Sequence, residues 1–148
     1  MPIKRPILRS DELLDRINKA LTPHRLPLLI GIDGADLSGK SSLASWLSWQ
    51  LGMPTVQLDL YLTSLHPIQW RTEDLARVVA KRIDTDRPII VEGVLLLDAL
   101  DQIERNADFL VFVKGGHAES SLAKQIEAYQ LRREPLKMAN FTMDGYKD

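Results

Sequence analysis

The chain contains no cysteine, few aromatic residues, no surplus of charge of one sign and no long hydrophobic run. The lack of cysteine excludes disulfides, thiolate metal sites and cysteine nucleophiles. A formal net charge of −1 argues against a nucleic-acid backbone as the main partner. No apolar run reaches membrane-spanning length, and the N-terminus lacks the apolar core of a signal peptide. We therefore expect a soluble, cytoplasmic protein with no membrane or nucleic-acid partner.

The remaining composition is that of an ordinary globular protein. Of the 148 residues, 45% are hydrophobic, which suffices for one core at this length. We expect one domain over residues 1–148, with an N-terminal helical extension over 1–27. The composition gives no information on the oligomeric state.

Continuous apolar segments alternate with amphipathic ones along the chain. The predicted strands lie at about 28–33, 54–59, 89–93, 109–113 and 140–144. The predicted helices lie at about 10–21, 40–51, 72–83, 94–104 and 118–133. Apolar strands that alternate with helices favour a parallel sheet covered on both faces. The sequence therefore predicts a three-layer α/β/α fold with a five-stranded parallel sheet.

A phosphate-binding motif connects the first predicted strand to the following helix. Residues 34–41 read G-x-x-x-x-G-K-S, the pattern of a P-loop (Walker A) in P-loop NTPases. Lys40 is expected to reach the β- and γ-phosphates, and the Ser41 hydroxyl to bind Mg²⁺. The competing interpretation is a glycine-rich turn with a solvated lysine, which the strand and helix on either side disfavour. The residues expected to bind the phosphates are Gly34, Ala35, Asp36, Leu37, Ser38, Gly39, Lys40, Ser41 and Ser42.

Two carboxylates end predicted strands, where ligands bind in parallel sheets. Asp59 is expected to accept the proton of an attacking hydroxyl or to orient that hydroxyl, and its alternative role is to cap a turn. Glu92 is expected to bind Mg²⁺ together with Ser41, and a structural ion pair is an equally good interpretation. Together with the P-loop, these residues predict one crevice at the carboxyl edge of the sheet.

Four stretches resemble the uridine kinase and phosphoribulokinase group of P-loop kinases. The stretches are 31–34 running into 38–44, 59–61, 90–93 and 107–113, in the order found in that group. The resemblance implies phosphate binding by residues 34–42, a position of Asp59 near the acceptor hydroxyl, and a position of Glu92 near Mg²⁺ or the acceptor. It also implies a mobile lid over residues 114–134.

The resemblance implies an ATP-dependent phosphotransferase that uses Mg²⁺ and transfers the γ-phosphate to a hydroxyl of a nucleoside- or sugar-like small molecule. Arg132 and Arg133 are the candidates for covering the charge that develops on the phosphoryl group. Their alternative role is that of a solvated helix end.

Two departures from the group keep a second function open. The lid has fewer arginines than is usual in the group, and Leu37 replaces a small P-loop residue. The alternative is an ATP-binding regulatory or switch protein with little or no turnover. A GTPase is disfavoured because the chain has no Asn-Lys-x-Asp guanine signature.

Overall fold

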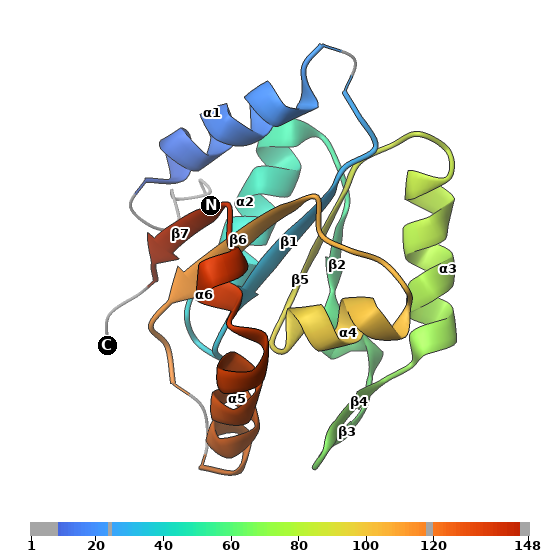
Figure 1. Cartoon of the computed structure of the whole chain (residues 1–148). Helices are drawn as coiled ribbons and strands as arrows, with labels where there is room; N and C mark the ends of the chain where they lie inside the picture. Colours follow the sequence, from blue (N-terminus) through green and yellow to red (C-terminus); the bar gives the residue numbers. More distant parts are fainter. Residues whose placement is uncertain (1–8, 24, 118–119, 146–148) are drawn as a thin grey trace.

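Five strands form one parallel sheet in the computed structural model, which describes residues 9–23, 25–117 and 120–145 (Figure 1). The strands are β1 (Leu29–Gly34), β2 (Thr55–Gln57), β5 (Ile89–Gly93), β6 (Phe109–Lys114) and β7 (Phe141–Asp144). Their order is β2-β5-β1-β6-β7, and each neighbouring pair is parallel. This confirms the predicted five-stranded parallel sheet.

Helices cover both faces of the sheet. They are α1 (Ser10–Leu21), α2 (Lys40–Leu51), α3 (Thr72–Ile83), α4 (Leu96–Gln102), α5 (Ser120–Arg133) and α6 (Pro135–Met138). Buried side chains of α1 and α2 pack with Ile30 and Ile32 of β1, whereas α3, α4 and α5 pack with Leu29 on its other face. Successive side chains of β1 therefore point to opposite faces of the sheet, each covered by helices, and this gives the predicted three layers. No helix of the described residues is long and apolar enough to cross a membrane.

The central strands explain why the sequence signal for this sheet is clear. Every residue of β1 and of β5 is buried, so both strands read as nearly continuous apolar segments. β1 leads into the loop 35–39, and α2 begins directly after Gly39, whose φ of 98° is a left-handed conformation that favours glycine. The loop therefore lies where β1 ends and α2 begins.

The segment after β2 differs from the sequence prediction. β2 ends at Gln57, and a short 3-10 helix, Leu58–Tyr61, contains Asp59 where the sequence predicted the end of a strand. An antiparallel hairpin of β3 (Leu62–Leu65) and β4 (Ile68–Trp70) follows, where the sequence predicted a loop. In Figure 1 this hairpin and α5 extend beyond the same edge of the sheet.

Some predicted features lie outside the described residues. These are positions 1–8 and 24 of the N-terminal extension, and positions 118–119 at the start of the last predicted helix. The described part of that helix is α5, which ends at Arg133, before Pro135 as predicted. Glu134, between α5 and α6, has a left-handed φ of 49° that interrupts the helical path.

Candidate functional site

A cavity of about 390 Å³ lies at the edge of the sheet where β1, β2 and β5 end, and we call it the site cavity. Lys40 and Ser41, the last two residues of the 34–41 motif and the first of α2, line it. Asp59 reaches it from the 3-10 helix, and Glu92 reaches it from β5. Three segments far apart in the sequence thus bring together an ammonium, a hydroxyl and two carboxylates.

The loop 35–39 curls around the carbonyl oxygen of Ala35. Lys40 Nζ donates a hydrogen bond to this oxygen at 3.0 Å, and the Ser38 backbone N–H donates to it at 3.4 Å. The Lys40 side chain is buried, so its ammonium is held inside the turn of the loop. Ser38 Oγ is also buried and has no hydrogen-bond partner among the described residues. The Ala35 carbonyl oxygen thus joins the Lys40 ammonium to the backbone of Ser38, whose buried hydroxyl is left without a partner among the described residues.

Ser41 and Glu92 are in direct contact. Ser41 Oγ donates a hydrogen bond to Glu92 Oε1 at 2.9 Å, and the Glu92 side chain is buried. Burial raises the pKa of Glu92 above its ordinary value and the negative charge of Asp59 adds to this, although the Ser41 hydrogen bond and the Lys40 charge act in the opposite direction. A cation placed between Ser41 and Glu92 would relieve this cost of burial.

The connection from β6 to α5 packs against the P-loop. Gly116 has a left-handed φ of 72°, and a Cβ atom there would lie 2.2 Å from the Asp36 carbonyl oxygen. The His117 N–H donates to the same oxygen at 2.9 Å. Because any larger residue at position 116 would displace the P-loop backbone, this position requires glycine. The start of the expected lid region, 114–134, is thus in contact with the loop 35–39.

Comparison with known proteins gives matches only among solved structures. No family model matches the chain, and no curated protein does. A structure described as a possible uridine kinase from Bacillus stearothermophilus superposes with a TM-score of 0.68 at 20% identity, covering 92% of this chain and 97% of that one. A sugar kinase from Janibacter sp. HTCC2649 superposes with a TM-score of 0.55 at 16% identity, covering 80% of this chain and 85% of that one.

This chain has the fold of the P-loop kinases. The fold class inferred from the sequence is therefore confirmed, and so is the resemblance at the level of the fold. At this identity the likeness does not extend to substrate or activity, which are argued below from the residues themselves.

Ser41 at the start of α2 and Glu92 in β5 fit a magnesium ion. Ser41 Oγ and Glu92 Oε1 are oxygen ligands of the kind that Mg²⁺ prefers, and they already lie 2.9 Å apart. No group of three or more His, Cys, Asp or Glu side chains in the described residues forms a metal site. This small number of protein ligands suits Mg²⁺, which usually keeps several waters and binds substrate phosphates.

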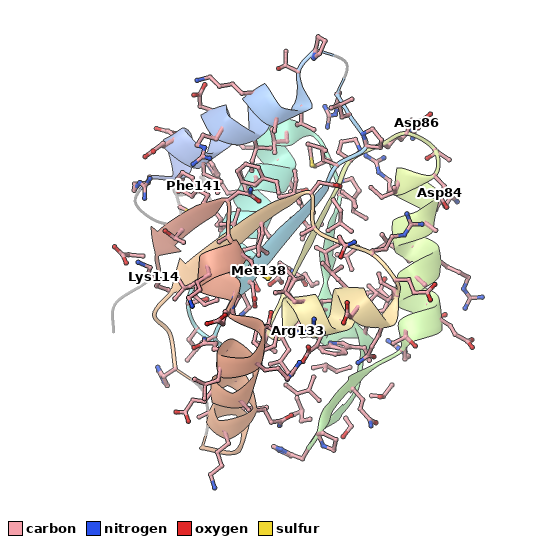
Figure 2. All side chains as sticks on the ribbon, in the orientation of Figure 1. Asp84, Asp86, Lys114, Arg133, Met138 and Phe141 are labelled. Atoms are coloured by element: carbon pink, nitrogen blue, oxygen red, sulfur yellow. The ribbon has the colours of Figure 1, made fainter. Side chains whose placement is uncertain are left out.

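Arg132 and Arg133 lie outside the site cavity. The Arg132 guanidinium donates to both carboxylate oxygens of Asp98, and Arg133 donates to Asp98 and Asp101. Figure 2 shows Arg133 between α5 and α4. These side chains line a separate cavity together with Ile68 and Trp70, which also line the site cavity and form the wall between the two. The sequence-based role of both arginines in catalysis stays a prediction.

Burial by itself would raise the pKa of Asp98 above its ordinary value. The hydrogen bonds and charges of Arg132 and Arg133 together outweigh this effect and hold the pKa of Asp98 below its ordinary value. Asp98 is therefore negatively charged, and its ion pairs connect α4 to the end of α5. We call the ion-paired group of Asp98, Asp101, Arg132 and Arg133 the arginine clamp.

Sequence reasoning missed two side chains of α5 that organise the site. Tyr129 donates a hydrogen bond to Asp33, next to the P-loop, and Gln125 is hydrogen-bonded to the backbone of the β3–β4 hairpin. Tyr129 follows Leu122 and Ile126 at helical spacing, so the sequence marks it as a residue of the buried face. No local signal identifies its partner, which lies 96 residues away.

Proposed function

We propose that this chain is an ATP-dependent phosphotransferase that transfers the γ-phosphate of ATP to a hydroxyl of a small-molecule acceptor. The Ser41–Glu92 hydrogen bond is the observation that supports this best, because it joins both proposed magnesium ligands beside Lys40. The resemblance of the four sequence stretches implies a nucleoside- or sugar-like acceptor. The proposed unit is a single P-loop kinase-like domain over 1–148, with a helical extension over 1–27.

The proposed roles at the phosphate end follow from charge. Backbone N–H groups over residues 34–42 surround the β- and γ-phosphates, and the N-terminus of α2 adds its positive dipole. Lys40 neutralises the transferring group. Ser41 and Glu92 would hold Mg²⁺, which would supply further positive charge beside the phosphates. Phosphoryl transfer depends mainly on such positioning and charge stabilisation.

Asp59 is the proposed partner of the attacking hydroxyl. Its side chain is exposed and lines the same cavity as Lys40 and Glu92, so an acceptor in the cavity lies within its reach. A carboxylate in this position accepts the hydroxyl proton or orients its lone pair toward the phosphorus.

The lid is proposed to comprise residues 114–134. Its start is fixed on the P-loop through Gly116, and its end carries Arg132 and Arg133. For either arginine to cover the transferring phosphoryl group, it must leave the carboxylates of the arginine clamp. A catalytic role of these arginines therefore requires movement of α5 relative to α4.

The arginine clamp also favours the second candidate function. A protein whose lid arginines stay paired with Asp98 and Asp101 binds ATP without the charge stabilisation that fast transfer needs. Such a protein would act as a nucleotide-binding switch.

ADP release in the presence of an acceptor panel separates the two candidates. The kinase proposal expects ADP formation that depends on one class of acceptor, is abolished by Lys40→Ala and falls roughly 100-fold or more in Asp59→Ala. Lys19→Ala is the matched control, because Lys19 lies on α1 and pairs with Asp15. A slow rate that is the same with every acceptor contradicts the kinase proposal and favours the switch.

A further inference from the structure

The acceptor end of the site cavity is bounded by apolar side chains. Leu58 belongs to the 3-10 helix, and the hairpin contributes four residues. The lid helix α5 adds one more. The apolar residues of this wall are Leu58, Leu62, Leu65, Ile68, Trp70 and Leu122. We call this set the apolar wall.

An irregularity in the hairpin creates this wall. In a regular strand, residues three apart point to opposite faces of the sheet. The register of β3 against β4 shifts between Leu62 and Ser64, so Leu62 pairs with Trp70 while Leu65 pairs with Ile68. This bulge allows Leu62 and Leu65 to line the same cavity.

Polar side chains near the apolar wall are already occupied by the backbone. Gln125 Oε1 accepts a hydrogen bond from the Ile68 N–H at 2.9 Å, and Gln125 Nε2 donates to the Leu65 carbonyl oxygen at 2.8 Å. The Arg71 guanidinium donates to the Leu60 carbonyl oxygen at 2.7 Å. Among the described residues that line the cavity, the polar side chains come from the P-loop and its helix, the 3-10 helix and β5, and they are Asp36, Lys40, Ser41, Ser42, Asp59 and Glu92.

This distribution discriminates between classes of alcohol. A sugar or a ribonucleoside carries several hydroxyls, and each one that enters the cavity without a partner costs roughly 10-fold or more in affinity. An acceptor with an apolar body gains affinity because its surface is removed from water when it packs against the leucine and tryptophan side chains. A single hydroxyl at Asp59 pairs with a polar side chain directly beside the apolar wall, because Asp59 follows Leu58 in the same 3-10 helix.

We propose that the site cavity takes a compound with one primary hydroxyl on an apolar, aromatic or branched body, and that this compound is the phosphate acceptor. The second half of this statement rests on the proposed function. The hydroxyl oxygen forms a bond to the γ-phosphorus while the bond from that phosphorus to the β–γ bridging oxygen breaks. ADP leaves with the bonding electron pair, and the hydroxyl proton passes to Asp59.

Binding and turnover are measured separately on the full chain saturated with Mg·ADP and Mg·ATP, respectively. The probes are 2-naphthylmethanol, uridine and D-ribose, titrated by NMR for dissociation constants and assayed for ADP release. We expect 2-naphthylmethanol to bind at least 10-fold more tightly than uridine or ribose. Comparable or tighter binding of uridine or ribose, or no binding of 2-naphthylmethanol, overturns the proposal.

Leu65→Asn tests the apolar wall directly. Leu65 is 47% exposed, so the substitution leaves the fold intact while it places an amide in the wall. We expect it to weaken 2-naphthylmethanol binding at least 3-fold and to leave ATP affinity unchanged. Leu131→Asn, on an 83% exposed residue of α5 outside the cavity, is the matched control. Equal affinities of Leu65→Asn and the wild type overturn the proposal.

The two readouts distinguish this inference from the proposed function. Binding of 2-naphthylmethanol that is sensitive to Leu65→Asn, without ADP release from any acceptor, supports the apolar site and contradicts the phosphotransferase. ADP release with uridine or ribose but not with 2-naphthylmethanol supports the phosphotransferase and overturns the apolar acceptor.

Discussion

Tyr129 donates its hydroxyl hydrogen to Asp33 Oδ2 at 2.5 Å, which connects α5 to the strand that leads into the P-loop. The same carboxylate accepts the Gly34 N–H at 2.8 Å, and the Tyr129 oxygen accepts the Leu97 N–H at 3.0 Å. These hydrogen bonds join β1, α4 and α5. Movement of α5 is therefore coupled to the backbone of the P-loop through one buried carboxylate.

The first prediction concerns the pH dependence of stability. Burial raises the pKa of Asp33 from its ordinary value of 3.8 to about 6, although the hydrogen bonds from Tyr129 and Gly34 lower it. Between these values the folded carboxyl keeps a proton that the unfolded one has lost. Its contribution to the free energy of unfolding therefore falls as the pH rises to about 6, by about 3 kcal/mol at most, and is constant above.

Urea unfolding of the wild type and Asp33→Asn from pH 4 to pH 8 checks this prediction. Because the amide does not titrate, the wild-type free energy of unfolding should decrease relative to the variant up to about pH 6. Asp15→Asn, an exposed residue of α1 paired with Lys19, is the control. Parallel curves for the wild type and Asp33→Asn would contradict the raised pKa.

The second prediction concerns the arginine clamp. Asp98→Asn removes the charge that both arginines share, and we expect it to lower the free energy of unfolding by about 1–2 kcal/mol. The variant weakens the hold on both arginines, although Arg133 keeps its ion pair with Asp101, so acceptor-dependent turnover should persist. The double variant Arg132→Ala/Arg133→Ala should lower that turnover roughly 1000-fold. Equal turnover of the double variant and Asp98→Asn would assign the arginines to helix packing alone.

The third prediction concerns the magnesium requirement. Glu92→Gln keeps an oxygen that accepts the Ser41 hydrogen bond but removes the negative charge, so the Mg²⁺ concentration at half-maximal ATP binding should rise at least about 10-fold. A magnesium titration of ATP binding measures this, with the exposed Glu104→Gln as control. Because the pKa of Glu92 is raised, wild-type magnesium affinity should decline with falling pH at a higher pH than for an ordinary glutamate. An unchanged magnesium requirement would show that Glu92 does not bind the metal and has a structural role instead.

The sequence predicts the sheet because β1 and β5 are buried on both faces and read as apolar runs. It predicts the start of α2 because the glycine pattern of a P-loop is local. The hairpin escapes prediction because its strands are short and the bulge between Leu62 and Ser64 interrupts the alternation.

Contacts between distant segments are not encoded in a local pattern. Arg132 and Arg133 follow the rule that basic residues favour the last turn of a helix. Nothing in the local sequence of α4 indicates that its carboxylates pair with these two arginines. The pairing of Tyr129 with Asp33 likewise depends on how α5 packs on the sheet. Such contacts become visible only once the helices have been placed.

The central claim is that residues 34–42 bind the phosphates of ATP around Lys40, and calorimetric titration with Mg·ATP tests it most directly. The account predicts saturable binding of one ATP per chain to the wild type and to Lys19→Ala, and loss of that binding in Lys40→Ala. No binding to the wild type, or equal affinity of Lys40→Ala, would contradict it.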